Sequence, residues 1–370
     1  MNLNLESICW DGLFPRNAAS GNASDFARTH VGTDILVTGA GGSIGSALAE
    51  AIYSLNPRTL VLLDSSEQNL YRIHSKLSSL SGRERHVPIL GSVADERCLR
   101  DLFERYQPET IYHAAALKHV PLGEMNPFAV VQNNVFGTSI LAMMARHFVA
   151  KRLIMISTDK AVNSRSIMGA SKRLAEIVLL AAGNEETRMT STRLGNVLAS
   201  EGSVVPLFLE QIARGGPLTV TDPEVVRYFL TMEETVHRIL SACVACPPGG
   251  SVNVPVMGEP IKIAALARYL IEQASANGVG ITYTGLRPGD KLQEEFVAQD
   301  ETPSGLPGDG IQWIDSPHLS QADLTVGLAE LNEAMDGMNI TKLLATLTRL
   351  VPEYQPSAFL QQQAAAVAAH

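Results

Sequence analysis

The sequence of 370 residues is poor in cysteine, in long apolar runs and in basic charge, and each shortage excludes a class of protein. Four Cys are too few for a disulfide scaffold, which favours a reducing compartment. No run reaches the roughly 18–20 apolar residues that span a bilayer, and the opening MNLNLESICWDG lacks the segments of a signal peptide. A net charge of −9 argues against a nucleic-acid partner. We therefore expect a cytoplasmic protein with no membrane span.

The few cysteines include one C-x-x-C pair, formed by Cys243 and Cys246 at the end of the segment EETVHRILSACVAC. No second cysteine pair or histidine cluster accompanies it, as a metal site usually requires. Packing on a buried helix explains the pair more simply than metal or redox chemistry does. We predict no metal site.

What the sequence does contain is an alternation of short apolar runs with longer amphipathic segments. The composition, 45% hydrophobic and 18% charged, suits one large globular domain or two smaller ones. Strands alternating with helices are typical of an α/β fold with a doubly wound parallel sheet and helices on both faces. The apolar runs are DILVTGA, TLVLLD, HVPILGS, TIYHAAA, RLIMIST and MTSTRLGNV.

A glycine-rich turn, VTGAGGSIGSALAE, follows the first of these runs and opens an amphipathic segment. The glycines alone would indicate only a tight turn. Between a strand and a helix, however, they favour dinucleotide binding, because a pyrophosphate can approach the backbone at the helix N-terminus. The cofactor-binding residues predicted at this turn are Thr38, Gly39, Gly42, Ser43, Ile44 and Gly45.

Asp64 ends the second apolar run, 19 residues after Gly45. A carboxylate at this point accepts a hydrogen bond from the ribose 2′-hydroxyl of NAD. No Lys or Arg follows closely in DSSEQNLYR, so the 2′-phosphate of NADP would meet Asp64 and Glu67 with little compensation. We therefore predict NAD as the cofactor.

Changes of composition divide the chain into four segments. Residues 1–30 are polar and irregular and are expected to form an N-terminal strap, and residues 31–200 form the NAD-binding Rossmann domain. Residues 201–300 mix loops, helices and short strands, which suits a smaller α/β substrate lobe. Within 301–370 we expect a loop over 301–318, helices near 325–335 and 340–350, and a low-complexity tail, QQQAAAVAAH, that is either a helix end or disordered.

Further candidates lie at the ends of the later apolar runs, because ligands of an open parallel sheet bind beyond the carboxyl ends of its strands. A neighbouring Asp and Lys are usually surface charges, but the pair in STDK stands at such an end. The residues expected at this edge are Ser92, Val93, Ala114, Ala115 and Ala116 for the cofactor, and Thr158, Asp159 and Lys160 for the reaction.

The segment MGASKRLAE places Met168 four residues before Lys172. A short-chain dehydrogenase usually has a Tyr at this distance from its catalytic Lys, and a thioether cannot carry a proton. Either the chain is a broken oxidoreductase or the proton transfer has moved elsewhere, with Asp159 and Lys160 as the nearest candidates.

Together the motifs resemble the extended short-chain dehydrogenases that act as nucleotide-sugar 4,6-dehydratases. The nearest group is the CapD-like polysaccharide-biosynthesis branch, which includes UDP-N-acetylglucosamine 4,6-dehydratases, and the likeness covers residues 33–300. Many members carry an N-terminal membrane region, which we do not expect here. Some have Met where most have Tyr, so Met168 does not indicate a dead enzyme. The motifs are TGAGGSIGS, HAAALKHVP, STDKAV, MGASKRLAE, RLGNVLASEGSVVPLF, TVTDPEVVRYFLT and LRPGDKLQEE.

The resemblance implies a reaction in which NAD oxidises C4 of the sugar, a base removes the C5 proton, water leaves from C6, and hydride returns to C6. It implies that Lys160 is the base, that Asp159 is the acid, and that Lys172 holds the nicotinamide ribose. A lysine acts as a base only where burial and nearby cations favour its neutral form. Without a Tyr, we expect water or a relay through Thr158 to take the C4 proton. Met168 belongs to the same catalytic set.

The resemblance also implies a set of substrate-binding residues for a UDP-sugar. Lys118 and His119 would lie near the hexose and Asn196 near the diphosphate. Arg227 and Arg287 would clamp the diphosphate with paired donors, although a surface salt bridge is the alternative for each. Glu294 would bind a nucleotide ribose hydroxyl.

Several questions stay open. Ser92 stands where many relatives have an Asp that contacts adenine, so weaker adenine selection is expected. Retention or inversion at C5 is not determined. The alternatives are an NAD-dependent C4 or C5 epimerase, which needs no acid at C6, and a non-catalytic NAD-sensing module, which has no need of Lys160 and Lys172. We also expect a homo-oligomer, since this superfamily commonly dimerises through two helices per subunit and the helix with Lys172 is a candidate.

Overall fold

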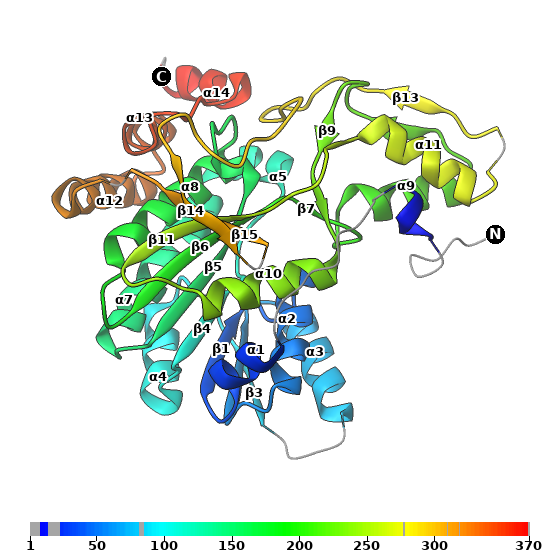
Figure 1. The fold of residues 1–370 in the computed structure, drawn as a ribbon. Coiled ribbons are helices and arrows are strands. Elements are labelled where there is room, and N and C mark those ends of the chain that lie inside the picture. The colour runs from blue at the N-terminus through cyan, green and yellow to red at the C-terminus, as the bar shows by residue number, and fades with distance from the viewer. Residues whose placement is uncertain are drawn as a thin grey trace.

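A parallel sheet forms the centre of the protein, here a computed structural model that describes residues 8–13, 23–80, 85–276, 278–308, 310–317 and 319–368 (Figure 1). Among these residues, seven parallel strands run in the order β11-β6-β5-β4-β1-β2-β3, and an antiparallel hairpin, β15-β14, extends the sheet beside β11. The strands are β1 Asp34–Thr38, β2 Thr59–Asp64, β3 His86–Leu90, β4 Thr110–His113, β5 Arg152–Thr158, β6 Arg188–Leu194, β11 Gly250–Pro255, β14 Thr302–Gly308 and β15 Ile311–Asp315.

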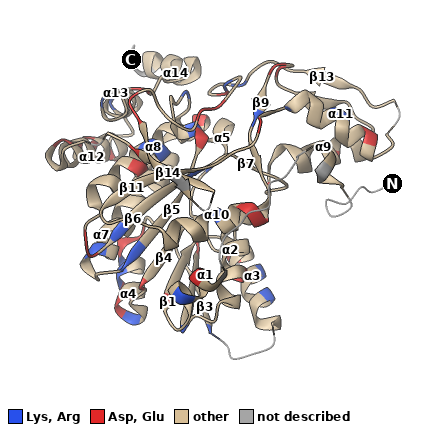
Figure 2. Cartoon of the chain, viewed as in Figure 1, with Lys and Arg blue, Asp and Glu red and all other residues tan. Residues whose placement is uncertain are grey.

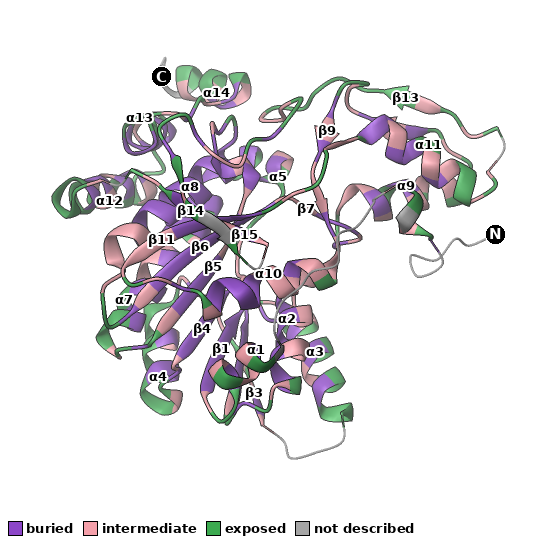
Figure 3. Ribbon diagram, viewed as in Figure 1, coloured by how far each residue is buried: buried purple, intermediate pink, exposed green. Residues whose placement is uncertain are grey.

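Helices cover both faces of this sheet, which explains why its central strands are apolar along their whole length. In β1, Ile35 and Val37 pack against one layer and Leu36 against the other, and all three are fully buried (Figure 3). The first layer contains α1 Ala23–His30, α2 Ser43–Ser54, α3 Glu67–Ser79 and α10 Met232–Val244. The second contains α4 Glu96–Tyr106, α7 Gly137–His147 and α8 Ile167–Ala182. The α/β class predicted from the alternating runs is therefore confirmed.

A second, smaller group of elements stands beyond the carboxyl ends of the strands (Figure 1). Its separate hydrophobic core is formed mainly by α9, α11, β8 and β13. The elements are α9 Val204–Ala213, α11 Ile263–Gln273, β8 Leu218–Val220, β9 Val226–Arg227, β12 Ile261–Lys262 and β13 Ile281–Tyr283; β7 Asn196–Val197 and β10 Phe229–Leu230 connect it to the sheet. Charged residues are spread over the helices and loops of both parts (Figure 2).

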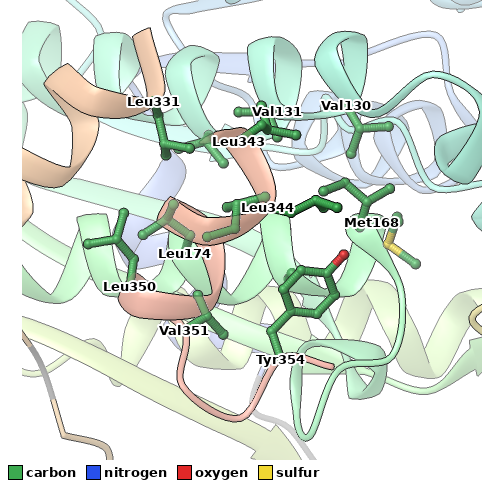
Figure 4. Close-up of a cluster of buried hydrophobic side chains, with 14 of the residues drawn as sticks. Val130, Val131, Met168, Leu174, Leu331, Leu343, Leu344, Leu350, Val351 and Tyr354 are labelled. Atoms are coloured by element: carbon green, nitrogen blue, oxygen red, sulfur yellow. The ribbon is translucent and has the colours of Figure 1, made fainter. Parts of the chain in front are cut away.

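Three helices at the C-terminal end pack on α8, the helix that carries Lys172. They are α12 Gln321–Asp336, α13 Ile340–Leu350 and α14 Ala358–Ala368. Figure 4 shows Leu343, Leu344 and Tyr354 facing Met168 and Leu174 of α8 across a continuous apolar cluster. Residues 167–179 of α8 are all buried. The chain itself therefore covers the helix that was expected to face a partner subunit, and the expectation of an interface there is wrong; the homo-oligomer itself stays a prediction.

Several short helices complete the chain. They are η2 Trp10–Gly12, α5 Val120–Met125, α6 Pro127–Val131, the π-helix η3 Gln132–Phe136 and the 3-10 helix η4 Asp159–Ala161. The segment Pro127–His147 is long and apolar enough to cross a membrane by length and composition, but 56% of its apolar window is buried inside the protein. A core helix of a water-soluble fold passes the same test, so this segment is weak evidence for a membrane span.

Three of the predicted boundaries were wrong. Residues 232–255 were assigned to the substrate lobe, but they contain α10, which covers the main sheet, and β11, which pairs with β6 in that sheet. The segment 301–318, predicted as a loop, contains the hairpin β14-β15, which completes the main sheet. Pro303 and Pro307 are tolerated because β14 is an edge strand, where a missing N–H costs no ladder bond. Residues 23–30 of the predicted strap form a helix whose Phe26 packs on the sheet layer. The rest of the strap lies partly outside the described residues.

Two other predictions were confirmed. Cys243 and Cys246 are buried, and Cys243 packs in the cluster between α10 and the sheet, as expected for core residues. The described part of the low-complexity tail is helical, as one of its two interpretations had it. Residues 369–370 lie outside the described part of the chain.

Candidate active site

The glycine-rich turn joins β1 to α2 in a conformation that only glycine allows. Gly39 has a φ of +64°, and a Cβ there would lie 2.6 Å from the backbone nitrogen of Ala115. A Cβ at Gly45 would lie 2.0 Å from the carbonyl oxygen of Gly39. The first turn of α2 is thus pressed against the loop, and its free N–H groups face the carboxyl edge of the sheet, where a phosphate is favoured.

Asp64, at the end of β2, is fixed by backbone donors on both of its carboxylate oxygens. Gly41 N donates to Oδ2 at 2.8 Å and Ser66 N donates to Oδ1 at 2.8 Å. Gly41 is itself confined, because a Cβ would lie 2.4 Å from the backbone of Asn69. Each oxygen of Asp64 keeps a further lone pair for a ribose hydroxyl.

His113 ends β4 and forms a hydrogen-bond chain beside the turn. Thr138 donates to the carbonyl of Asn134 at 2.6 Å, so its oxygen accepts from His113 Nε2 at 3.0 Å. Nδ1 of His113 then accepts from Thr38 at 2.7 Å. Burial, together with the charge of Lys172, lowers the pKa of His113 to about 3, so the ring is neutral at physiological pH. This chain of hydrogen bonds fixes the side chain of Thr38 and the position of His113 at the end of β4.

The other residues predicted for the cofactor lie along the same edge. Ser92 accepts from Ala94 N at 3.2 Å, and Val93 is buried beside Gly137. Ser43 accepts from Glu201 N at 3.0 Å, and Ile44 packs on the sheet. Ala114, Ala115 and Ala116 follow β4, with Ala115 against Gly39. Gly42 caps α2.

The reaction end lies where β5 runs into η4. Asp159 is fully buried, and its Oδ1 accepts from Thr158 Oγ1 at 2.9 Å and from Lys160 Nζ at 2.9 Å. The backbone N–H of Lys160 donates to Thr158 Oγ1 at 3.3 Å, which fixes the rotamer of that hydroxyl. Oδ2 of Asp159 has no hydrogen-bond partner among the described residues. A buried acceptor without a protein partner is costly unless a ligand completes it.

Lys160 has further neighbours that come from the second group of elements. Its Nζ lies 3.3 Å from Asn196 Oδ1 and 3.9 Å from Glu294 Oε1. Glu294 is buried and also lies 3.7 Å from Arg227 Nη2 and 3.1 Å from Lys291 Nζ. The contact with Lys291 is an ion pair without hydrogen-bond geometry. Four predicted residues and Lys291, which sequence reasoning missed, therefore meet at one point.

The guanidinium of Arg227 donates hydrogen bonds to backbone carbonyls, including two in the segment that leads to Glu294. It donates to the carbonyls of Val226, Leu292 and Lys291 at 2.7, 3.1 and 2.9 Å. These bonds tie β9 to residues 291–294 and so hold Glu294 in place. The predicted diphosphate contact of Arg227 stays a prediction.

Lys172 is buried on α8, within the part of the fold that faces the cofactor edge. Burial lowers its pKa to about 8, against the opposing effect of Glu176. Glu176 is shared with Arg193 and Arg173, whose nitrogens lie 2.7 and 3.2 Å from its Oε2. Arg193 also binds Glu301 at 2.6 Å. A buried ion network therefore underlies Lys172.

Met168 and Gly169 shape the start of α8. A Cβ at Gly169 would lie 2.1 Å from the carbonyl oxygen of Lys160, so α8 and η4 are in direct backbone contact. Met168 is 3% exposed and packs in the apolar cluster with the C-terminal helices (Figure 4). The residue at the usual Tyr position thus contributes packing, and the proton-carrying groups lie on η4.

Lys118 and His119 are held by the loop of residues 199–203. Lys118 Nζ donates to the carbonyl of Glu201 at 2.8 Å, and a Cβ at Gly202 would lie 2.5 Å from the His119 ring. The same loop binds Ser43 through Glu201 N. The loop therefore contacts both the residues predicted to bind the cofactor and those predicted to lie near the hexose.

Arg287 stands apart from this cluster. Its side chain is 57% exposed and pairs with Asp290 at 2.9 Å. The described structure does not bring it to the Asp159–Lys160 pair, and its diphosphate role stays a prediction.

Known proteins resemble the chain in sequence and in fold. Residues 35–311 match the family described as polysaccharide biosynthesis protein. The chain belongs to this family. It is 41% identical over 303 residues to the capsular polysaccharide biosynthesis protein CapD of Staphylococcus aureus, covering 80% of this chain and 50% of CapD. The chain thus spans about half the length of that relative.

Two further proteins that resemble this chain are named as enzymes. The comparison in each case is with the chain itself. It is 31% identical to an inverting UDP-N-acetylglucosamine 4,6-dehydratase of Campylobacter jejuni, over 73% of this chain and 79% of the relative. It is 29% identical to a UDP-glucose 4-epimerase of Rickettsia canadensis, over 72% and 78%. The family therefore borders on both dehydratases and epimerases of nucleotide sugars.

Solved structures agree on the fold. Pen from Bacillus thuringiensis is 28% identical, with a TM-score of 0.73 over 79% of this chain and 92% of Pen. DesIV, a dTDP-glucose 4,6-dehydratase from Streptomyces venezuelae with NAD bound, is 21% identical, with a TM-score of 0.63 over 71% and 87%. The second likeness shows the fold alone. The chain therefore shares the Rossmann-type α/β fold of these proteins.

Proposed function

We propose that the chain is an NAD-dependent nucleotide-sugar 4,6-dehydratase that acts on UDP-N-acetylglucosamine. The observation that carries the proposal is the hydrogen-bonded trio of Thr158, Asp159 and Lys160, in which Asp159 is fully buried and one of its oxygens lacks a partner among the described residues. A dehydration needs an acid and a base beside adjacent carbons, and this trio offers both within one turn of η4. The Campylobacter relative bears the same activity in its name.

The residues present fit NAD as the cofactor. The turn at Gly39 and Gly45 leaves no space for side chains and brings backbone N–H groups to the sheet edge. Asp64 is fixed to accept from a ribose hydroxyl, which opposes a 2′-phosphate. When bound, NAD would supply reversible hydride transfer to and from the sugar. Lys172, cationic below about pH 8, would hold its nicotinamide ribose.

Thr158 is the residue that connects C4 of the sugar to the acid. Its hydroxyl already donates to Asp159 Oδ1 at 2.9 Å. If Thr158 accepts the proton of the C4 hydroxyl while passing its own to Asp159, no Tyr is needed. Asp159 is then protonated, which is the form that an acid at C6 requires. This relay accounts for Met168 at the usual Tyr position.

Lys160 completes the proton balance. In its neutral form it takes the C5 proton, which the C4 ketone has made acidic, while Asp159 gives its proton to the C6 hydroxyl and water leaves. This leaves a cationic Lys160 beside an anionic Asp159, the ion pair found in the structure. Lys160 then returns its proton to C5 as hydride reaches C6. The proton from C4 has left with the water, so the cycle consumes no net proton. In deuterated water the ammonium group of Lys160 exchanges with solvent before it protonates C5, which places deuterium there.

An epimerase is the second candidate, because the likeness extends to a UDP-glucose 4-epimerase. A C4 epimerase needs no acid at C6, so it gives no reason for a buried carboxylate with a free oxygen beside Lys160. The UDP-sugar specificity, the cytoplasmic location and the substrate roles of Lys118, Asn196 and Arg287 belong to the same proposal.

The deciding experiment incubates the protein with UDP-N-acetylglucosamine in deuterated water and follows the product by NMR and mass spectrometry. Loss of water, a new C6 methyl group and deuterium at C5 are expected, and the coupling constants give the stereochemistry at C5. A C4 epimer of unchanged mass without deuterium would instead establish an epimerase. Lys160→Ala should keep NAD affinity and abolish exchange at C5; retained exchange would contradict its role as the base.

A further inference from the structure

Glu294, predicted to bind a nucleotide ribose hydroxyl, lies beside Lys160 in the structure. Its carboxylate is 3% exposed and lies 3.9 Å from the Nζ of Lys160. We propose that Glu294 is a positioning residue that holds the proton-loaded form of Lys160 between Asp159 and Asn196. This inference rests on the proposed function for its catalytic meaning.

The surroundings of Lys160 are those of an ammonium group. Three oxygens face its Nζ, those of Asp159 at 2.9 Å, Asn196 at 3.3 Å and Glu294 at 3.9 Å. An ammonium group has three N–H donors, so this set matches its cationic form in number. Glu294 is the second carboxylate of the set.

Two other cations limit this stabilisation. Arg227 and Lys291 lie 3.7 and 3.1 Å from the carboxylate of Glu294. One carboxylate shared by three cations compensates each of them only in part. Lys160 can therefore lose its proton to C5 and still be favoured while it carries that proton. With Asp159 alone, the protonated form of Lys160 would be stabilised too weakly. With a Glu294 that had no other cationic neighbour, that form would be stabilised too strongly to give up its proton.

The geometry also explains how Glu294 is kept in place. Residues 291–292 are bound to β9 through the guanidinium of Arg227, and Lys291 donates to the carbonyl of Val162 at 2.6 Å. Val162 follows η4 directly. The segment of Glu294 is thus fastened to the same turn that carries Asp159 and Lys160, so their separation is fixed by backbone contacts.

The first test needs no substrate. Glu294→Gln removes the charge and keeps the shape of the side chain. Labelling of Lys160 by acetic anhydride at fixed neutral pH, followed by peptide mass spectrometry, should become about tenfold faster, since a carboxylate close to an amine favours its charged, unreactive form. Lys342, whose side chain is 38% exposed, serves as the internal reference.

Glu295→Gln is the matched control. Glu295 is the next residue, is exposed, pairs with Asn163, and loses the same charge. It should leave the labelling of Lys160 unchanged. Equal labelling of Lys160 in the wild type and in both variants would overturn the inference. If Glu294→Gln does not fold, Glu294→Asp should give a smaller increase, because its carboxylate is withdrawn by one methylene, and no increase would again overturn it.

The second test separates positioning from ribose binding. With UDP-N-acetylglucosamine, Glu294→Gln should lower kcat about tenfold or more, with KM changed by less than about threefold, because the contact is made to the base and not to the substrate. A raised KM with unchanged kcat would favour the ribose contact instead. If no dehydration occurs in the wild type but the labelling still accelerates, the proposed function fails and the link between Glu294 and Lys160 stands.

Discussion

His113 shows how much of the site depends on single buried polar residues. It hydrogen-bonds Thr38 and Thr138 through its two ring nitrogens, yet it transfers no proton in the proposed reaction. Because its ring is buried beside Lys172, the folded protein holds it neutral down to about pH 3.

This burial makes stability depend on pH in a defined window. In the unfolded chain His113 takes up a proton below about pH 6.5, whereas in the folded protein it takes up that proton only near pH 3. Stability should therefore fall as the pH falls from 6.5 towards 3, by about 1.4 kcal/mol per pH unit for this group. His113→Gln should have a shallower profile in urea unfolding at pH 4–6.5.

The two profiles should run parallel above pH 7, where both states hold His113 neutral. Parallel profiles throughout pH 4–6.5 would contradict the assignment. His30, whose pKa burial also lowers, is present in both proteins and cancels in the comparison.

At the same scale, the sequence placed the reacting residues better than their supports. Asp159 and Lys160 follow an apolar run, and strand ends converge by topology, so their position could be predicted. Glu294 reaches Lys160, and Lys291 reaches Glu294 and Val162, only because the segment 291–294 packs against η4. No spacing in the sequence encodes that approach, and the predicted ribose role of Glu294 stays a prediction.

At the scale of elements, the junction between η4 and α8 decides whether the site is assembled. Gly169 permits backbone contact with Lys160, and Ser166 caps α8 by accepting from Gly169 N at 3.1 Å. Ile167 N donates to the buried Glu124 at 2.8 Å. The catalytic turn and the helix of Lys172 thus form one rigid unit.

Gly169→Ala should push η4 and α8 apart. Its Cβ would lie 2.1 Å from the Lys160 carbonyl oxygen and 2.3 Å from Ser164 Oγ. We expect about 1–3 kcal/mol of lost stability from overpacking and a larger fall in kcat than in NAD affinity, measured by thermal unfolding, turnover and cofactor titration.

Gly258→Ala is the control, because Gly258 is exposed and no atom lies within 4 Å of its added Cβ. It should match the wild type in both measurements. A Gly169→Ala variant with unchanged turnover would show that α8 and η4 adapt to each other.

The elements themselves were predictable to different degrees. The parallel strands and their helices followed from apolar runs and a glycine turn. The hairpin β14-β15 did not, because Pro303, Pro307 and several glycines suggest a loop unless the edge position is known. The packing of α12–α14 onto α8 is a tertiary contact between segments far apart in sequence.

At the scale of the whole molecule, Arg193 joins the sheet, α8 and the C-terminal region. It is fully buried and binds Glu176 of α8 and Glu301, while Arg173 extends the network to Glu353. Burial, the largest single effect, would raise the pKa of Glu301, but the hydrogen bond and charge of Arg193, the charge of Arg173 and the backbone N–H of Ala298 together outweigh it and lower that pKa to about 2.

Arg193→Met should leave the buried carboxylates of Glu176 and Glu301 with Arg173 as their remaining cationic partner. Breaking a buried pair from one side costs about 3–5 kcal/mol, and the free energy of unfolding in urea measures it. Arg214→Met removes an exposed pair with Glu210 and should cost about 0–1 kcal/mol. Similar losses in the two variants would show that the buried network is not integral to the fold.

The apolar cover that α12–α14 place on α8 also has a consequence for biosynthesis. A chain leaves the ribosome from its N-terminus, and domains tend to fold as they emerge. Helix α8 is translated before residues 321–360 and exposes its apolar face until they arrive. We therefore expect the candidate site to be completed late, with apolar surface of the kind that chaperones bind exposed during that interval.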